Sequence, residues 1–273
     1  LVAQRCLYGV DRNPRAVDLA RLSLWLETLA RDHEFTFLDH ALKCGDSLVG
    51  LTRGQITSLH WDTAEGLPLF GALVRERIEA AVNGRREIRE APDDVARSVQ
   101  EIRYRHIETR LNNVRLIANA VVAAFFSAEK TKAREAKRQE IESWANGAAA
   151  EMWPKLETLG QSLRCGDHPI LPFHWEIEFP EVFAAENAGF DAMIGNPPFA
   201  GKNTIIAGNA DGYLLWLQTL HKGAHGNADL VAHFFRRAFS LLRHGGVFGL
   251  IATNTIGQGD TRASGLARIS HRM

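Results

Sequence analysis

Short apolar segments alternate with helical segments along this chain, and that alternation limits the fold more than any other feature. Residues 190–195 and 247–253 are apolar runs of strand length. Residues 229–242 between them have the pattern of an amphipathic helix, and the basic and glycine residues 243–246 are expected at its C-terminal end. Strands that are apolar throughout and separated by helices indicate a parallel sheet covered on both faces. The expected fold class is α/β, with a mostly parallel, doubly wound sheet.

The same pattern occurs near the start of the chain. Residues 7–10 form an apolar run that ends at Asp11. Asn13-Pro14 then predicts a helix, because a capping residue is followed by proline at the first helical position. A second strand is expected directly before Cys44. The helix is expected to bury a broad apolar face made of Val17, Leu19, Leu22, Leu24, Trp25, Leu26 and Leu29.

A long helical insertion interrupts the α/β pattern. Its composition shifts to Arg, Glu and Ala, which divides the chain into residues 1–70, the insertion at 71–165 and residues 166–273. Helix breaks are expected at Asn83-Gly84 and at residues 92–94. Arg alternates with Glu here, which is typical of a solvated helix surface and less often of a DNA-facing one. Apolar stripes with helical spacing occur at Val95, Val99 and Ile102 and at Leu111, Val114, Ile117 and Val121.

Composition limits the class of protein. The 273 residues include 32 Lys and Arg and 32 Asp and Glu, so the chain lacks the basic excess usual in a self-sufficient DNA binder. It contains no apolar run of about 18 residues and no secretory pattern at its start, so we expect a cytoplasmic protein without a membrane partner. The cysteines Cys6, Cys44 and Cys165 are far apart, and no disulfide framework or metal site is expected.

The segment Asn196-Pro197-Pro198-Phe199 carries the clearest chemical signal, because it follows a predicted buried strand at the end where ligands bind in open α/β sheets. An exocyclic amine such as adenine N6 is a poor nucleophile, since its lone pair is delocalised into the ring. The Asn196 side-chain oxygen and the Pro197 carbonyl are two acceptors for its hydrogens. The prolines fix the backbone and hold these acceptors in place.

Phe199 offers a face on which an extruded base can stack. Such extrusion is required because the amine is inaccessible inside a duplex. No metal or covalent intermediate is needed, since alignment of the amine with a methyl donor lowers the barrier. The alternative is that Asn-Pro-Pro is only a stiff turn after a strand.

Several motifs in order resemble those of N6-adenine DNA methyltransferases. Residues 195–199 resemble the catalytic motif, Tyr8-Gly9-Val10-Asp11 the acidic second-strand motif, and residues 44–48, Cys-Gly-Asp-Ser-Leu, the next cofactor motif. Residues 174–183 and 253–262 resemble the large restriction-modification and phage-defence members in particular.

The resemblance implies S-adenosyl-L-methionine as cofactor and double-stranded DNA, with a flipped adenine, as partner. It implies that Asp11 binds the ribose hydroxyls, and that Asp46, with Ser47 beside it, binds the cofactor adenine through its amino group. Without the resemblance, Asp11 is a turn or capping acid and Asp46 belongs to a tight turn. Gly-Asp-Ser-Leu at 45–48 also matches a serine-esterase signature, but the partner blocks that such a hydrolase needs are missing from this sequence.

The resemblance also predicts what this chain does not contain. A strand and glycine-rich cofactor loop are expected before Asp11, and a target-recognition region after Arg262, so the chain is expected to be an internal fragment that is inactive alone. The fold is then a partial Rossmann-like sheet with a gap between the strands that end at Asp11 and Asn196. Two alternatives stay open: a binding or assembly remnant that pairs with a partner supplying the missing segment, and a methyltransferase that acts on RNA or on a protein glutamine.

Overall fold

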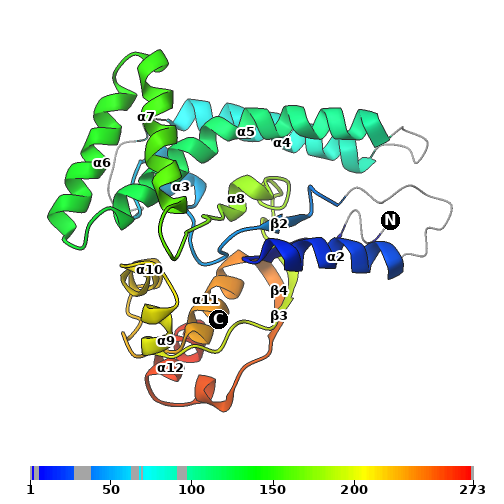
Figure 1. Ribbon diagram of the computed structural model, residues 1–273. Helices are drawn as coiled ribbons and strands as arrows, with labels where there is room; N and C mark the ends of the chain where they lie inside the picture. Colours follow the sequence, from blue (N-terminus) through cyan, green and yellow to red (C-terminus); the bar gives the residue numbers. More distant parts are fainter. Residues whose placement is uncertain are drawn as a thin grey trace.

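A computed structural model gives the structure of the chain and describes residue 2 and residues 6–27, 38–62, 68, 70–90 and 97–271 (Figure 1). The fold is α/β with a majority of helix and two short pairs of parallel strands. Among the described residues, no helix combines the length and apolar character needed to cross a bilayer.

The strands form two separate two-stranded sheets. β1 (Gly9–Asp11) pairs in parallel with β2 (Leu42–Cys44), and β3 (Phe190–Gly195) pairs in parallel with β4 (Leu242–Leu250). The strands expected near Asp11, before Cys44 and before Asn196 are therefore confirmed. In the described part of the chain, β1 and β3 each have one hydrogen-bonding edge without a strand partner.

The β3–β4 sheet is covered on one face only. Helix α11 (Leu230–Leu241) packs against it, with the Phe235 and Phe248 rings edge to face at 5.7 Å. On the opposite face, Ile194 is 90% exposed and Val247 is 65% exposed. The prediction that helices cover both faces was therefore wrong for the described residues. These strands have apolar side chains on both faces, but the described helices bury only one of them.

The junction between α11 and β4 also differs from the expectation. The helix predicted over residues 229–242 is found as α11, and Asp229 caps it, because its side chain accepts a hydrogen bond from the Val231 N–H. Residues 243–246, however, lie in β4, which begins at Leu242 directly after the helix. The register jumps between the pairs Phe190–Leu242 and Ala192–Val247, so the glycines at 245 and 246 form an irregularity in the strand rather than a helix end.

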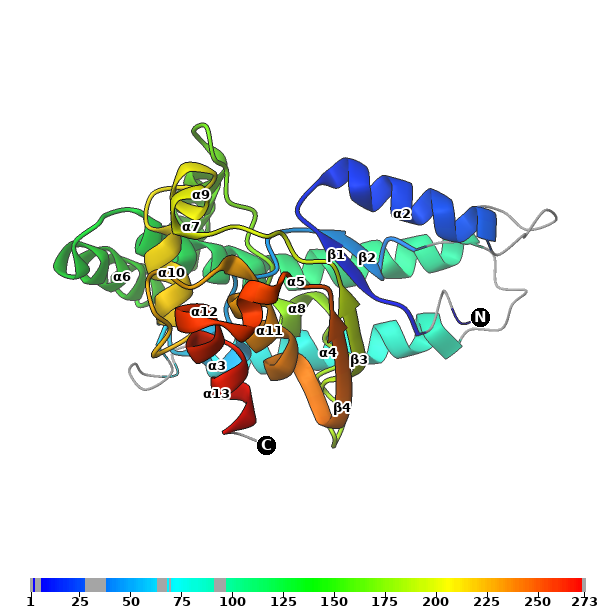
Figure 2. The ribbon, with the colours of Figure 1, turned by 90° about the horizontal axis from the view of Figure 1, so that it is seen from below.

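Helix α2 (Pro14–Glu27) begins where the sequence predicts, and the Asn13 side chain accepts a hydrogen bond from the Arg15 N–H. The helix lies against β1 and β2 (Figure 2). The expected broad buried face was wrong, because only Val17 is fully buried while Leu19, Leu22 and Leu26 are exposed. The predicted position at 29 lies outside the described residues.

Four helices form a layer on the other side of β2 (Figure 1). They are α4 (Gly71–Glu90), α5 (Arg97–Phe126), α6 (Thr131–Ala145) and α7 (Ala149–Gln161), followed by the short η1 (Ser162–Arg164). The stripe Leu111, Val114, Ile117 and Val121 is fully buried in the main core, as predicted. Val99 and Ile102 are exposed, so the first predicted stripe was wrong at these positions. Residue 95 lies outside the described residues.

The break predicted at Asn83-Gly84 was wrong, because α4 continues through both residues. Gly84 has a packing role instead. A Cβ placed there would lie 2.8 Å from Ile107 Cδ1 of α5, so glycine allows the two helices to approach closely. The break predicted at residues 92–94 falls outside the described residues.

Short helices complete the fold around the strand ends. They are α3 (Arg53–Thr57), α8 (Trp175–Glu178), α9 (Lys202–Ala207), α10 (Tyr213–Leu220), η2 (Asn254–Gly257), α12 (Gly259–Ser264) and α13 (Leu266–Ser270). Helix α3 begins with a capping box, in which Thr52 accepts from the Gln55 N–H and the Gln55 side chain accepts from the Thr52 N–H.

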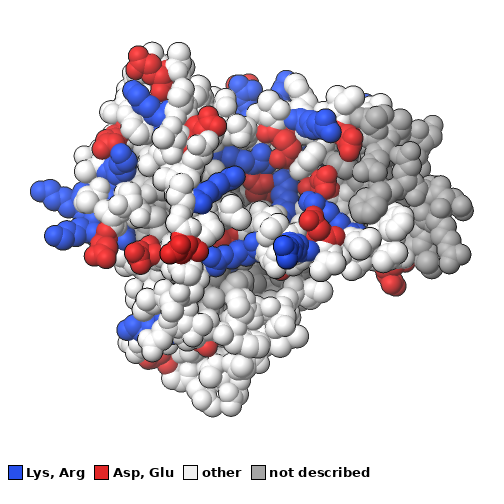
Figure 3. All heavy atoms as spheres, viewed as in Figure 1, with Lys and Arg blue, Asp and Glu red and all other residues white. Residues whose placement is uncertain are grey.

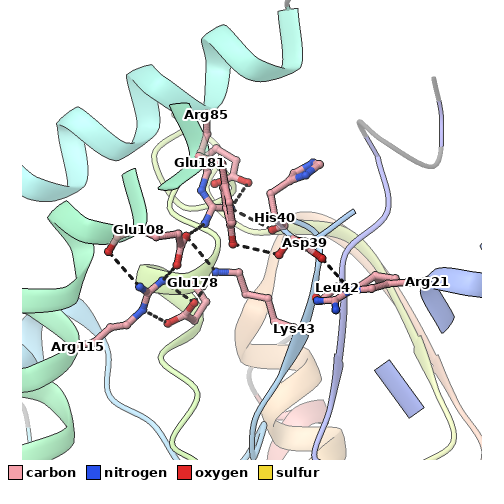
Figure 4. Close-up of polar contacts among 11 residues, drawn as sticks. Arg21, Asp39, His40, Leu42, Lys43, Arg85, Glu108, Arg115, Glu178 and Glu181 are labelled. Atoms are coloured by element: carbon pink, nitrogen blue, oxygen red, sulfur yellow. Dashed lines mark hydrogen bonds and ion pairs between the residues drawn. The ribbon is translucent and has the colours of Figure 1, made fainter. Parts of the chain in front are cut away.

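A buried ion network joins β2 to the helical layer (Figure 4). Lys43 of β2 donates to Glu178 of α8 at 2.6 Å, and Arg115 of α5 pairs with the same carboxylate at 2.6 Å. Arg115 also pairs with Glu108 at 2.7 Å. Arg85 of α4 extends the network to Glu108 at 3.1 Å and to Glu181 at 3.3 Å. The network therefore ties four elements together through side chains that water reaches poorly.

The cations decide the charge state of Glu178. Burial raises the pKa of this carboxyl, but Lys43 and Arg115 outweigh burial and hold its pKa well below the ordinary value. Glu178 is therefore ionised at neutral pH. Because the folded pKa is depressed, this contribution to stability is present above the unfolded pKa of about 4.3 and is lost as the pH falls towards the folded value.

We expect Glu178→Gln to lower the free energy of unfolding by about 3–5 kcal/mol, since it leaves two buried cations with less compensation. The matched control is Glu151→Gln, which removes an exposed pair with Lys155 on α7 and is expected to change stability by less than about 1 kcal/mol. Urea unfolding at neutral pH measures both values. Equal losses in the two variants would show that the network does not stabilise the fold.

Candidate functional site

The carboxyl ends of β1 and β2 bring two of the predicted site residues to one edge. Asp11 ends β1 and is exposed, and its side chain accepts from the Asn13 N–H at 2.7 Å. The Asp11 carbonyl accepts from the Gly45 N–H at 3.0 Å, next to Asp46. Neighbouring parallel strands therefore deliver both acids to the edge where α/β folds bind ligands.

Asp46 is buried, with 6% of its surface exposed. One carboxylate oxygen accepts from the Leu48 N–H at 3.0 Å. The Tyr213 hydroxyl lies 2.9 Å from the other oxygen and 3.1 Å from the first. The carboxylate thus anchors its own turn and also holds helix α10, which follows it by more than 160 residues in the chain.

Two arginines surround this carboxylate without a direct hydrogen bond to it. Burial raises the pKa of Asp46, while the bonds from Leu48 and Tyr213 and the positive charge of Arg12 oppose the rise. Arg237 of α11 is also buried, and burial lowers its pKa to about 10. In the described part of the chain, its Nε and one terminal nitrogen have no hydrogen-bond partner.

The turn that carries Asp46 is held from the 173–175 segment. The Trp175 indole donates to the Ser47 carbonyl at 3.0 Å, and the Leu51 N–H donates to the His174 ring at 3.0 Å. Burial lowers the pKa of His174 to about 4, which keeps that acceptor nitrogen unprotonated at neutral pH. A Cβ on Gly50 would lie 2.0 Å from the Phe173 carbonyl oxygen, so only glycine permits this approach. Ser47 itself is half-buried.

The Asn196–Phe199 segment is fixed at both ends. Before it, the Gly195 carbonyl accepts from the Ile251 N–H at 3.0 Å. After it, the Ala200 carbonyl accepts from the Leu230 N–H at 2.8 Å, at the start of α11. Pro197 is buried, whereas Asn196, Pro198 and Phe199 are exposed. The segment therefore presents the amide and the ring to solvent from a backbone with little freedom.

The segment after Phe199 links the two halves of the site. Tyr213 binds Asp46, and the Trp216 indole donates to the Leu48 carbonyl at 2.9 Å. Arg12, beside Asp11, donates to the Asn209 side chain at 2.7 Å. The structure therefore connects the Asn196 segment to the edge that carries Asp11 and Asp46 through α9 and α10.

Sequence patterns did not identify Tyr213, Arg12 or Arg237 as site residues. Tyr213 begins the apolar run Tyr-Leu-Leu-Trp-Leu, and a phenol in a buried apolar helix needs a hydrogen-bond partner. That requirement was a usable signal, but it does not say which distant residue supplies the partner.

The charges on the helical layer are mixed. Figure 3 shows Lys and Arg interspersed with Asp and Glu over the face drawn, above α4–α7. The pattern agrees with the pairing of Lys137 with Glu140 and of Lys155 with Glu151 on α6 and α7. This face of the layer does not present a uniformly basic surface.

Comparison with known proteins places the chain in a family. The sequence profile described as Eco57I restriction-modification methylase matches residues 5–270, nearly the whole chain. The chain is also 24% identical over 288 aligned residues to a protein of Methanocaldococcus jannaschii, whose name assigns it provisionally as a type II restriction enzyme and methyltransferase. The alignment covers 93% of this chain and 22% of that relative, so the chain spans about a fifth of its length. No solved structure matches the chain.

Proposed function

Because the chain belongs to the Eco57I restriction-modification methylase family, we propose that it is the cofactor- and target-binding part of a DNA methyltransferase that methylates adenine N6 from S-adenosyl-L-methionine. The observation that carries this proposal is the exposed Asn196 amide on a segment fixed at both ends. Family membership leaves the serine-esterase alternative without support.

The chemistry of the target follows from the acceptors at 196 and 197. Asn196 Oδ1 and the Pro197 carbonyl accept the two amino hydrogens of a flipped adenine, which localises the lone pair on N6. Phe199, 47% exposed, stacks against the extruded base. Pro197 and Pro198 restrict the backbone, so the acceptors need little rearrangement during transfer.

The acids at the β1–β2 edge suit the cofactor. When bound, S-adenosyl-L-methionine supplies an electrophilic methyl group. The exposed Asp11 carboxylate at a strand end suits a ribose diol. Asp46 uses Oδ1 and Oδ2 for Leu48 and Tyr213, and a lone pair on Oδ2 suits the adenine amino group. Ser47 lies directly beside it in the turn.

A further segment completes the sheet in this proposal. Tyr8, just before β1, packs against Phe190 at the start of β3 with ring centroids 5.7 Å apart. One edge of β1 and one edge of β3 have no strand partner in the described chain. A partly Rossmann-like sheet, completed by a strand and a glycine-rich loop from outside this chain, would pair the backbone groups of these edges. In the same proposal, a segment outside this chain supplies the target-recognition region.

Asn196→Ala, in a chain extended to include that strand and loop, is expected to abolish methyl transfer and leave cofactor affinity nearly unchanged. Asn196 contacts the target in this proposal and not the donor. Asp11→Ala is expected to weaken cofactor binding first. Radiolabelled methyl transfer to duplex DNA and calorimetric cofactor titration separate the two effects. An active Asn196→Ala enzyme would contradict the assignment, and transfer to RNA or protein in place of DNA would redirect the substrate class.

Phe199→Tyr is expected to retain base extrusion, because the stacking face remains. Phe199→Ala is expected to weaken binding of the extruded base by about 1–3 kcal/mol. A fluorescent base analogue at the target position reports extrusion in both variants. The same signal from the Phe and Ala forms would mean that the ring does not contact the base.

The chain alone is expected to bind S-adenosyl-L-methionine weakly. The methionine end of the cofactor carries a carboxylate and an ammonium, and each one left without a partner costs at least about 1–3 kcal/mol. Calorimetric titration of the chain and of an upstream extension tests this, and tight binding by the unextended chain would refute it.

The open strand edges favour a second candidate, an assembly piece that pairs with a partner chain. Gel filtration of the isolated chain, alone and with that extension in trans, distinguishes it.

A further inference from the structure

The hydrogen bond between Tyr213 and Asp46 joins two groups that are both nearly inaccessible to water. Tyr213 is 4% exposed and Asp46 is 6% exposed. The hydroxyl lies within 3.1 Å of both carboxylate oxygens, so its single hydrogen is shared between them. Trp216, one turn further along α10, binds the Leu48 carbonyl and supports the same turn without touching the carboxylate.

Other charged groups face Asp46 at longer range. Arg12 approaches from the turn after β1, where its guanidinium is held by Asn209. Arg237 approaches from α11, and the negative charge of Glu176 on α8 also acts on it. None of these groups forms a hydrogen bond with the carboxylate in the described chain, so Tyr213 is the side chain that orients it.

Counting acceptor sites shows what remains for a ligand. A carboxylate has about four lone-pair positions. The Leu48 and Val49 N–H groups and the shared Tyr213 hydrogen take up to three of them. One position is left, and it can accept an N–H. A carbonyl oxygen placed there would face an anionic oxygen with no hydrogen between them.

We propose that Tyr213 is a positioning residue, which orients the Asp46 carboxylate so that the site accepts a 6-amino purine and rejects a 6-oxo purine. This inference rests on the proposed function, in which Asp46 binds the base of the cofactor. It adds the group that gives Asp46 its selectivity.

The protonation of Asp46 links this selectivity to pH. Burial raises the pKa of Asp46, and the Tyr213 bond opposes that rise. Loss of the hydroxyl therefore raises the pKa further, and the carboxyl takes up a proton at a higher pH. A protonated carboxyl donates its O–H to a 6-oxo group, so the preference for the amino purine falls.

The test uses the complete methylase that contains this chain, with S-adenosylhomocysteine and S-inosylhomocysteine as probes. Dissociation constants of both are measured across pH 5 to 8 for wild type, Tyr213→Phe and the control Trp216→Phe. We expect wild type to prefer the adenosyl compound, and Tyr213→Phe to reduce that preference by about tenfold, the range of one charge-assisted hydrogen bond. The acid loss of adenosyl binding is expected to move to higher pH in Tyr213→Phe only.

Thermal unfolding of the two variants separates positioning from packing. If Tyr213→Phe lowers the unfolding temperature as Trp216→Phe does but keeps the wild-type preference and pH profile, Tyr213 is a packing residue and the inference is overturned. Wild-type enzyme that binds both probes equally overturns it too and leaves the proposed function standing. Wild-type enzyme that binds neither probe overturns the proposed function itself.

Discussion

The buried pairing of Lys43 with Glu178 is the interaction on which the arrangement of the molecule depends. Lys43 belongs to a three-residue strand, which is too short to hold its position by backbone hydrogen bonds alone. Its ammonium reaches the carboxylate that Arg115 also binds, and Arg85 joins through Glu108. Three cations and three carboxylates, including Glu181, therefore lock β2 against the helical layer with balanced charge. Removing one charged side chain from this network leaves an oppositely charged partner buried without compensation, close to side chains of its own charge.

The ion network also fixes the position of the turn that carries Asp46. Residues 45–51 continue directly from β2, so the turn with Asp46 inherits the position of the strand. The 173–175 segment, where α8 begins, then holds the same turn through the Trp175 indole, the His174 imidazole and the Phe173 N–H, which donates to the Val49 carbonyl. Tyr213 closes the arrangement by bringing α10 onto the Asp46 carboxylate. The helical layer thus supports the cofactor side of the proposed site without contributing a predicted site residue to it.

Local signals predicted much of this architecture. The cap at Asn13, the parallel strands and the buried stripe from Leu111 to Val121 depend on short-range patterns, and all were found. Expectations failed where burial was decided by partners elsewhere. Leu19 and Ile194 are apolar yet exposed, because nothing in the described chain covers them. Gly84 lies inside α4, where the absence of a side chain leaves room for Ile107 of α5, and composition alone does not reveal that neighbour.

The sequence by itself determined the α/β class, the order of the elements and the segment at Asn196, since periodicity, capping and proline stereochemistry act over a few residues. Only the tertiary structure decided which groups meet. Tyr213 binds a carboxylate 167 positions away, and Lys43 binds one 135 positions away. Such pairings follow from how burial and charge balance are satisfied together in three dimensions. A buried carboxylate needs a hydrogen-bond donor or a cation beside it, and tertiary packing decides which residue supplies it. A local sequence pattern does not identify that residue.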